Sequence, residues 1–253
     1  MQIYKRYFVP CILLLVLIAL FFIPAIQQDP AYHNFSDQRT LWGVPNFFNV
    51  MSTVPYFMIG LPVMVLLMST SRLVIIPALK PVYITFFAGV ALVCFGSGYY
   101  HLQPSNDSLL WDRLPMAISF MAFVTIIVAE YIDENLARKT FFPLLLAGIA
   151  SVIYWHYTET QQQGDLRPYI LVQFLPMIWI PYILLTKKSR FSHGHYYWLL
   201  IGSYVLAKIL EQGDGLVYEN LVVISGHSLK HLASAFAPLF FYLALRNRQV
   251  LST

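Results

Sequence analysis

Long apolar runs alternate with short polar segments along the whole chain. Eight runs are predicted to be helices, at residues 7–26, 44–68, 82–102, 109–129, 141–158, 168–186, 196–212 and 221–245. A helix needs about 20 mostly apolar residues to cross the hydrocarbon core of a bilayer, and each run comes close to that length. The pattern therefore predicts an all-α membrane protein with eight spanning helices.

The first run has an alternative interpretation. It follows Lys5 and Arg6 and resembles the start of a signal peptide. Its apolar stretch is longer than the usual 7 to 15 or so residues of a signal peptide, and no small-residue cleavage site follows it. An uncleaved leading helix over residues 1–26, followed by one domain over residues 27–253, fits better.

Composition supports a membrane protein and argues against a nucleic-acid partner. Hydrophobic residues make up 58% of the chain and charged residues only 11%, whereas about a quarter of residues are charged in ordinary soluble domains. The net charge is +4, but the basic residues form short clusters between apolar runs rather than a polar face. Cys11 and Cys94 both lie within apolar runs, which supports neither a disulfide framework nor a cysteine zinc site.

Lysine and arginine are distributed unequally between alternate loops, and this predicts the orientation. One side receives Lys5, Arg6, Arg72, Lys80, Arg138, Lys139, Lys187, Lys188, Arg190, Arg246 and Arg248, and the other only Arg39, Arg113 and Arg167. Because basic loops stay in the cytoplasm, both termini are expected there.

Five polar side chains fall within the runs and share one end of the predicted bundle. His227 and His231 are four residues apart near the start of the last run, Ser97 and His101 are four apart at the end of the third, and Asp112 opens the fourth. Residues four apart lie on one face of a helix. The orientation above places all five toward the non-cytoplasmic side, and ionisable groups at such depth are candidates for function.

These residue types together suit metal-assisted hydrolysis. Three neutral imidazoles and one water complete a catalytic zinc shell, and zinc both lowers the pKa of its water toward about 7 and polarises a carbonyl oxygen. Asp112 would orient or deprotonate the water, and Ser97 would donate a hydrogen bond to the developing oxyanion. The competing interpretation is structural: histidines bonded to neighbouring helices, Asp112 paired with Arg113 or capping its helix, and Ser97 bonded to a backbone carbonyl.

The arrangement Ser97-x3-His101, Asp112 within WDRLPM, and His227-x3-His231 resembles the signature of the CREST superfamily of membrane hydrolases, most closely its alkaline ceramidase branch. The resemblance covers residues 37–245. It implies a ceramidase-like bundle of seven transmembrane helices, here preceded by one extra helix. It also implies zinc held by His101, His227 and His231, Ser97 and Asp112 in the active site, and cleavage of ceramide-like lipids into sphingoid base and fatty acid.

The segment before the second run departs from that family. Eukaryotic alkaline ceramidases carry an acidic calcium-binding segment there, whereas this chain reads SDQRTLWGVPNFFNV. Asp37 and Asn46, with Asn49, are the remaining candidate oxygen ligands, although calcium prefers about six to eight oxygens.

Four charged residues near the last two runs are predicted to form ion pairs. Lys208 and Glu211 are three apart on one helix and can pair. Lys230 lies off the face that carries His227 and His231 and needs a partner at that depth, which we expect to be Glu211 or Asp214.

Three functions are compatible with these residues. The first is a zinc-dependent intramembrane hydrolase of lipid amides, which a membrane lipid enters sideways from the bilayer. The second is a phospholipase or acyl-ester hydrolase, because the same water would cleave an ester. The third is a receptor-like protein resembling the progestin and adipoQ receptors. Short loops favour the inner membrane of a bacterium, or the endoplasmic reticulum or Golgi in a eukaryote.

Overall fold

The computed structural model describes residues 19, 22–69 and 72–251, and its regular structure is helical. The elements are η1 (Pro30–His33), α2 (Phe47–Met51), α3 (Val54–Ser69), η2 (Pro77–Leu79), α4 (Lys80–Leu102), α5 (Asn106–Tyr131), α6 (Glu134–Thr160), α7 (Arg167–Thr186), α8 (His195–Gln212), α9 (Asp214–Leu221) and α10 (Gly226–Asn247). Leu41–Val44 and Phe191–Val250 form isolated bridges, and the described residues contain no β-strand.

Six segments are long and apolar enough to cross a membrane. They are Phe47–Ser69, Pro77–Leu102, Asn106–Tyr131, Glu134–Thr160, Arg167–Thr186 and Gly226–Asn247. Helices are the usual way for a chain to cross a bilayer, because most of their backbone groups are bonded within the segment. The prediction of a helical membrane protein is confirmed at this level.

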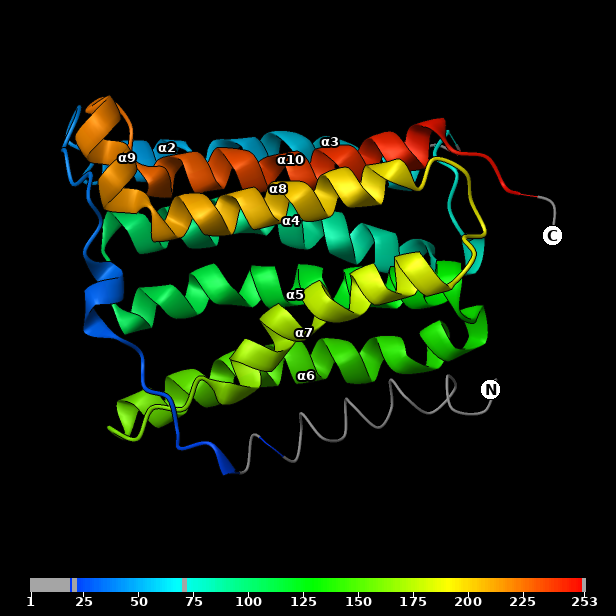
Figure 1. Ribbon diagram of the computed structural model, residues 1–253, viewed down its shortest axis with the longest axis horizontal. Helices are drawn as coiled ribbons and strands as arrows, with labels where there is room; N and C mark the ends of the chain where they lie inside the picture. Colours follow the sequence, from blue (N-terminus) through cyan, green and yellow to red (C-terminus); the bar gives the residue numbers. More distant parts are fainter. Residues whose placement is uncertain (1–18, 20–21, 70–71, 252–253) are drawn as a thin grey trace.

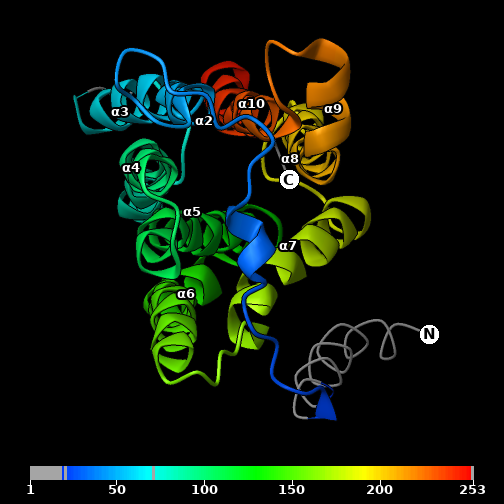
Figure 2. The ribbon, with the colours of Figure 1, turned by 90° about the vertical axis from the view of Figure 1, so that its left-hand side faces the viewer.

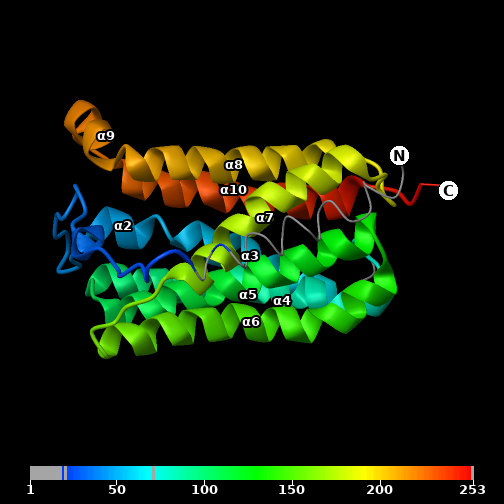
Figure 3. The same ribbon diagram turned by 60° about the horizontal axis from the view of Figure 1, so that its bottom comes forward.

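The predicted count of eight spanning helices is met only in part. Of the first predicted helix, 7–26, the structure describes only residues 19 and 22–26, so this helix and the division of the chain at residue 26 stay predictions. Helix α8 has 18 residues and runs beside α10 within the bundle (Figures 1 and 3). It is not among the six apolar segments, because polar residues including Lys208 and Glu211 lower its hydropathy.

The structure changes one predicted helix boundary near the histidines. Residues 214–221 form the separate short helix α9, and the last spanning helix starts at Gly226 rather than at residue 221. Ser225 ends the connection, since its side chain accepts a hydrogen bond from the Ser228 N–H and caps α10.

The long helices form one bundle around α5. Seen end-on, α3, α10 and α8 form one row, α4, α5 and α7 lie next to it, and α6 lies beyond (Figure 2). Most of the central part of α5 is buried inside this arrangement. The alternate loops gather at opposite ends: η1, α9 and the α6–α7 connection lie at one end, and the described C-terminal residues at the other (Figure 1).

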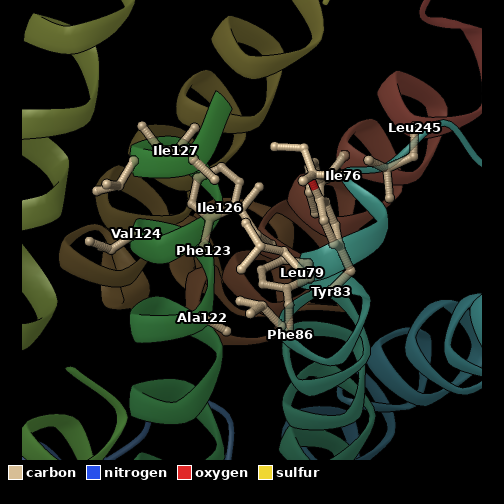
Figure 4. Packing of buried hydrophobic residues seen from close by; sticks show 14 of the residues in the cluster. Ile76, Leu79, Tyr83, Phe86, Ala122, Phe123, Val124, Ile126, Ile127 and Leu245 are labelled. Carbon is tan, nitrogen blue, oxygen red and sulfur yellow. The ribbon is translucent and has the colours of Figure 1, made fainter. Parts of the chain in front are cut away.

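Aromatic packing holds the end of the bundle that lies away from η1 and α9. Phe241 of α10 stacks against Phe87 with ring centroids 5.7 Å apart, and meets Phe86 and Phe123 edge-on at 5.1 and 5.3 Å. Figure 4 shows Phe86 and Phe123 within the wider cluster of α4 and α5 side chains. Such aromatic pairs stabilise beyond the area that they bury.

Small residues let α4 and α5 approach closely. A Cβ added to Gly89 would lie 2.3 Å from the Ser119 hydroxyl, and one added to Gly96 would lie 2.0 Å from the Trp111 carbonyl oxygen. Glycine at these positions allows backbones to come together, as is typical of helices packed within a membrane. Gly96 and Trp111 directly precede Ser97 and Asp112, so this contact sets the distance between those two side chains.

Candidate metal centre

Three buried histidines converge at one end of the bundle. His101 lies in the last turn of α4, and His227 and His231 lie in the first two turns of α10. The ring nitrogens that they offer all lie within 4.8 Å of one another. The structure thus joins the Ser-x3-His and His-x3-His segments, which are far apart in the sequence, into one group that could hold a metal ion.

The distances between these nitrogens fit zinc. His101 Nε2 and His231 Nε2 are 3.3 Å apart. Two Zn–N bonds of about 2.0–2.1 Å at a tetrahedral angle place their nitrogens roughly 3.3–3.4 Å apart. His227 Nε2 is buried and has no hydrogen-bond partner among the described residues, so it is free to serve as the third ligand. The residues present fit the group.

A hydrogen-bond chain fixes which nitrogen of His231 carries a proton. The Ser52 hydroxyl lies 2.8 Å from His231 Nδ1 and donates its proton to the Asn49 carbonyl oxygen at 2.9 Å. Because a hydroxyl has one proton to donate, Ser52 accepts from His231 Nδ1–H. His231 Nε2 is therefore unprotonated and faces His101, as a metal ligand requires.

The backbones that carry the other two histidines are also held from outside their helices. Asp214 accepts hydrogen bonds from the His227 N–H at 2.7 Å and from the Ser36 N–H at 2.9 Å. Asn46 donates from its side-chain amide to the His101 carbonyl oxygen at 2.9 Å. Asp214 thus anchors the start of α10, and Asn46 anchors the end of α4.

Two further residues near the histidines, Asn49 and Phe35, were not predicted from the sequence to support a metal centre. Asn49 is fully buried and accepts a hydrogen bond from Ser228 at 2.7 Å. The Phe35 ring lies 4.8 Å from the His101 ring and 4.5 Å from the His227 ring. With Ser52, these residues belong to the FFNVMST stretch and the segment before it, where the sequence suggested only a family likeness and candidate calcium ligands.

Ser97 and Asp112 contact each other. Ser97 is buried in α4, and its side chain is hydrogen-bonded to the half-buried Asp112 carboxylate. The structural interpretation of Asp112 does not hold: Ser105, not Asp112, caps α5. Arg113 donates to Gln28 Oε1 at 2.6 Å, and none of the described ion pairs joins it to Asp112.

Ser97 and Asp112 line a cavity of about 230 Å³ between the helices. The polar end carries His231, Ser97, Asp112, Arg113, Lys208, Glu211 and Lys230. Most of the remaining lining is apolar, including Phe120, Phe123, Met116, Met177 and Ile180, although Ser119, Gln173 and Ser234 also line it. A cavity with this division matches a molecule that has a polar head and an aliphatic chain.

The charged residues of α8 and α10 form a network centred on Glu211. Lys230 Nζ lies 2.5 Å from Glu211 Oε1, and Lys208 Nζ lies 2.6 Å from Glu211 Oε2. Glu211 is therefore the partner of Lys230. Asp214, the other expected partner, bonds to backbone N–H groups instead.

Asp37 and Asn46, the main candidate calcium ligands, have other partners, and so does Asn49. Asp37 is buried, and its carboxylate oxygens accept from Arg39 at 2.6 and 2.8 Å. Burial raises the pKa of Asp37, but the hydrogen bonds and charge of Arg39 outweigh burial and hold the pKa below its ordinary value of 3.8. The Asn46 amide donates to His101. Calcium binding at Asp37 and Asn46 stays a prediction.

Comparisons with known protein families, with curated proteins and with solved structures found no match to this chain. The case for a function therefore depends on the geometry of the site.

Proposed function

We propose that the protein is a zinc-dependent hydrolase that cleaves the amide bond of ceramide-like N-acyl lipids within the membrane. One observation carries the proposal: His231, one of three converging histidines, lines the same cavity as the Ser97–Asp112 pair, and most of the remaining lining is apolar. The three histidines would hold the zinc, and the products would be a sphingoid base and a fatty acid.

The chemistry would be divided between the metal and the chain. Zinc bound to three imidazoles supplies a Lewis acid and a water whose pKa falls to about 7. Asp112 accepts the proton of the attacking water and later delivers it to the leaving nitrogen. Ser97 donates to Asp112 and keeps one carboxylate oxygen directed toward the cavity, while Ser52 holds His231 in the ligand tautomer.

The shape of the cavity supports a lipid substrate. An acyl chain would lie against Phe120, Phe123 and Met177, and the amide would reach the level of His231 and Asp112. Burial of the chain excludes bulk water from the reacting bond, which strengthens the electrostatic interactions there.

The proposed location follows from the charge pattern. Basic residues cluster in the loops at the end away from the histidines, so both termini would be cytoplasmic and the site would face the non-cytoplasmic side. The proposed membrane is the inner membrane of a bacterium.

Metal analysis and lipid hydrolysis test the proposal together. Purified wild-type protein is expected to carry zinc, and His227→Ala to lose most of it, because one of three ligands is missing. Asp112→Asn should keep its zinc and release fatty acid about 10² to 10⁴ times more slowly, which is the usual contribution of a general base. Glu219→Gln, which removes an exposed carboxylate at the same end, is the control and should match wild type in both measurements.

The substrate panel contains ceramides, N-acyl amino lipids and phospholipids. Release of fatty acid from the amides alone supports the proposal, whereas release from phospholipids alone identifies an ester hydrolase. Zinc bound without hydrolysis of any lipid would contradict an enzymatic role and favour a receptor-like protein. Equal zinc in wild type and His227→Ala would rule out the histidine site.

A further inference from the structure

Arg113 is a buried cation that forms no ion pair with any described residue. Its side chain is 6% exposed, and its Nη1 is buried without a hydrogen-bond partner among the described residues. Its one side-chain hydrogen bond is to the neutral Gln28 amide oxygen, at 2.6 Å. A guanidinium cannot lose its proton in a protein. A buried guanidinium therefore needs either an opposite charge or several hydrogen-bond acceptors.

The other charged groups that line the same cavity are accounted for. Glu211 neutralises part of the Lys208 and Lys230 charge through two ion pairs. Asp112 is bonded to Ser97, and it interacts with the Arg113 charge electrostatically, without an ion-pair contact among the described residues. With three cations and two carboxylates in its lining, the cavity keeps an excess of positive charge, and Arg113 is the cation without an ion pair in the described part of the chain.

Aromatic rings hold the Arg113 guanidinium in place. Its central carbon lies 4.1 Å from the Trp155 ring centre, 4.8 Å from that of Tyr169 and 5.8 Å from that of Tyr32. Cation–π contacts of this kind orient a guanidinium without neutralising it. The planar guanidinium is therefore fixed in position while N–H donors remain available for another acceptor. Arginine side chains with free N–H donors commonly bind carboxylates and phosphates.

A third carboxylate, that of Glu159, supports the surroundings of Arg113. Glu159 Oε1 accepts from the Gln28 N–H at 2.7 Å and from Trp155 Nε1 at 3.2 Å. It holds the two neutral neighbours of Arg113, Gln28 and Trp155, and forms no ion pair with Arg113 among the described residues. These bonds make the pocket around Arg113 a preformed one.

We infer that Arg113 binds the oxyanion of an acidic lipid headgroup, a phosphate or a carboxylate, while the acyl chain of the same molecule lies in the apolar part of the cavity. Arg113 directly follows Asp112 in α5, and both line the cavity, so the headgroup would be bound next to the bond to be cleaved. This inference rests on the proposed function and specifies, among N-acyl lipids, those with an acidic headgroup as the preferred substrate.

Binding in detergent tests the inference without relying on catalysis. The probes are a lysophosphatidic acid and the monoacylglycerol with the same acyl chain, which differ only in the phosphate. Wild type is expected to bind the lysophosphatidic acid about tenfold or more tightly, because charged hydrogen bonds to an oxyanion are strong. Equal affinity for the two lipids in wild type would overturn the inference, whatever the variants do.

Variants then assign the preference to Arg113. Arg113→Gln should bind both lipids alike, and Arg113→Lys should recover part of the preference because it keeps the charge but loses the planar fork. Lys139 is exposed near the start of α6, at the opposite end of that helix from Trp155. Lys139→Gln is the matched control and should behave as wild type. A preference that survives in folded Arg113→Gln would also overturn the inference.

Two further arms separate this inference from the proposed function. Inorganic phosphate should not displace the lipid at matching concentration; displacement would show a site for the free anion and contradict a headgroup site. Zinc-free His227→Ala should keep the lipid preference.

If wild type hydrolyses acidic and neutral N-acyl lipids equally, the inference fails and the proposed hydrolase function remains supported. If it hydrolyses none but prefers the acidic lipid, the proposed function fails and the headgroup site stands.

Discussion

At the scale of single residues, hydrogen bonds fix the ring of His231 and the backbones of His227 and His101. Ser52 accepts from His231 Nδ1 and leaves Nε2 free, Asp214 holds the His227 N–H, and Asn46 holds the His101 carbonyl. In metal sites, outer-shell partners of this kind set ring tautomer and orientation, and their loss costs affinity although they never touch the metal.

Replacement of Ser52 by alanine tests this preparation. We expect Ser52→Ala to weaken zinc binding by about 10- to 100-fold, because His231 is then free to rotate or to adopt the other tautomer. A titration against a competing zinc chelator in detergent measures the change. Ser69→Ala removes an exposed hydroxyl that bonds to Val65 at the end of α3, and should bind zinc as wild type does. Equal zinc affinity in Ser52→Ala and Ser69→Ala would contradict the role of Ser52.

At the scale of elements, the spacing between α4 and α5 aligns the Ser97–Asp112 pair. The two helices touch at Gly96, where a Cβ would collide with the Trp111 backbone. Backbone atoms cannot rotate away as a flexible side chain can, so any added atom must move a whole helix.

Alanine at Gly96 is therefore expected to separate the helices. Overpacking of this kind costs about 1–3 kcal/mol, and the shift would lengthen the Ser97–Asp112 bond and slow hydrolysis more than it lowers zinc content. Thermal unfolding in detergent and fatty-acid release measure the two effects.

The matched control lies in α8. An added Cβ at Gly202 meets nothing within 4 Å, so Gly202→Ala should unfold at the same temperature as wild type or slightly higher, because alanine favours a helix over glycine. If Gly96→Ala behaved as Gly202→Ala does, the close contact would not be what aligns the site.

At the scale of the molecule, a buried ion pair closes the end of the bundle opposite the histidines. Arg248 follows α10, and its Nη1 lies 2.8 Å from Glu130 Oε1 of α5, with both side chains fully buried. Arg248 also donates to the Val74 carbonyl oxygen at 2.7 Å and lies over the Phe191 ring at 3.8 Å. The pair thus joins the C-terminal end of α10 to α5, the segment before α4 and the loop before α8.

Removing one partner should destabilise the whole bundle. Glu130→Gln leaves the Arg248 charge buried and unpaired, a change that typically costs about 3–5 kcal/mol. We expect a lower unfolding temperature and unchanged zinc content in the folded protein, because the pair is distant from the histidines along α5 and α10.

The double variant Glu130→Gln with Arg248→Met is the control for the charge itself. It removes both charges and should be less destabilised than the sum of the two single changes, since neither charge is left alone. Additive losses in that cycle, or a Glu130→Gln protein as stable as wild type, would show that the pair does not couple these elements.

The sequence alone was sufficient to predict the helical membrane fold and the principal residues of the candidate site. Apolar runs of spanning length are a local property, and an ionisable residue inside such a run is costly enough to stand out. The four-residue spacing of His227 and His231 follows from helix geometry. These are facts about neighbours in the chain, so the pattern reveals them.

Only the tertiary structure decided which distant groups meet. Ser52 reaches His231, Gln28 reaches Arg113, and Glu211 rather than Asp214 reaches Lys230. Each pair is separated by many residues or joins different helices, and its contact depends on helix rotation and on close approaches of under 4 Å. A shift of one residue in the packing would exchange these partners without changing the apolar pattern, which is why that pattern predicts the bundle and not its hydrogen bonds.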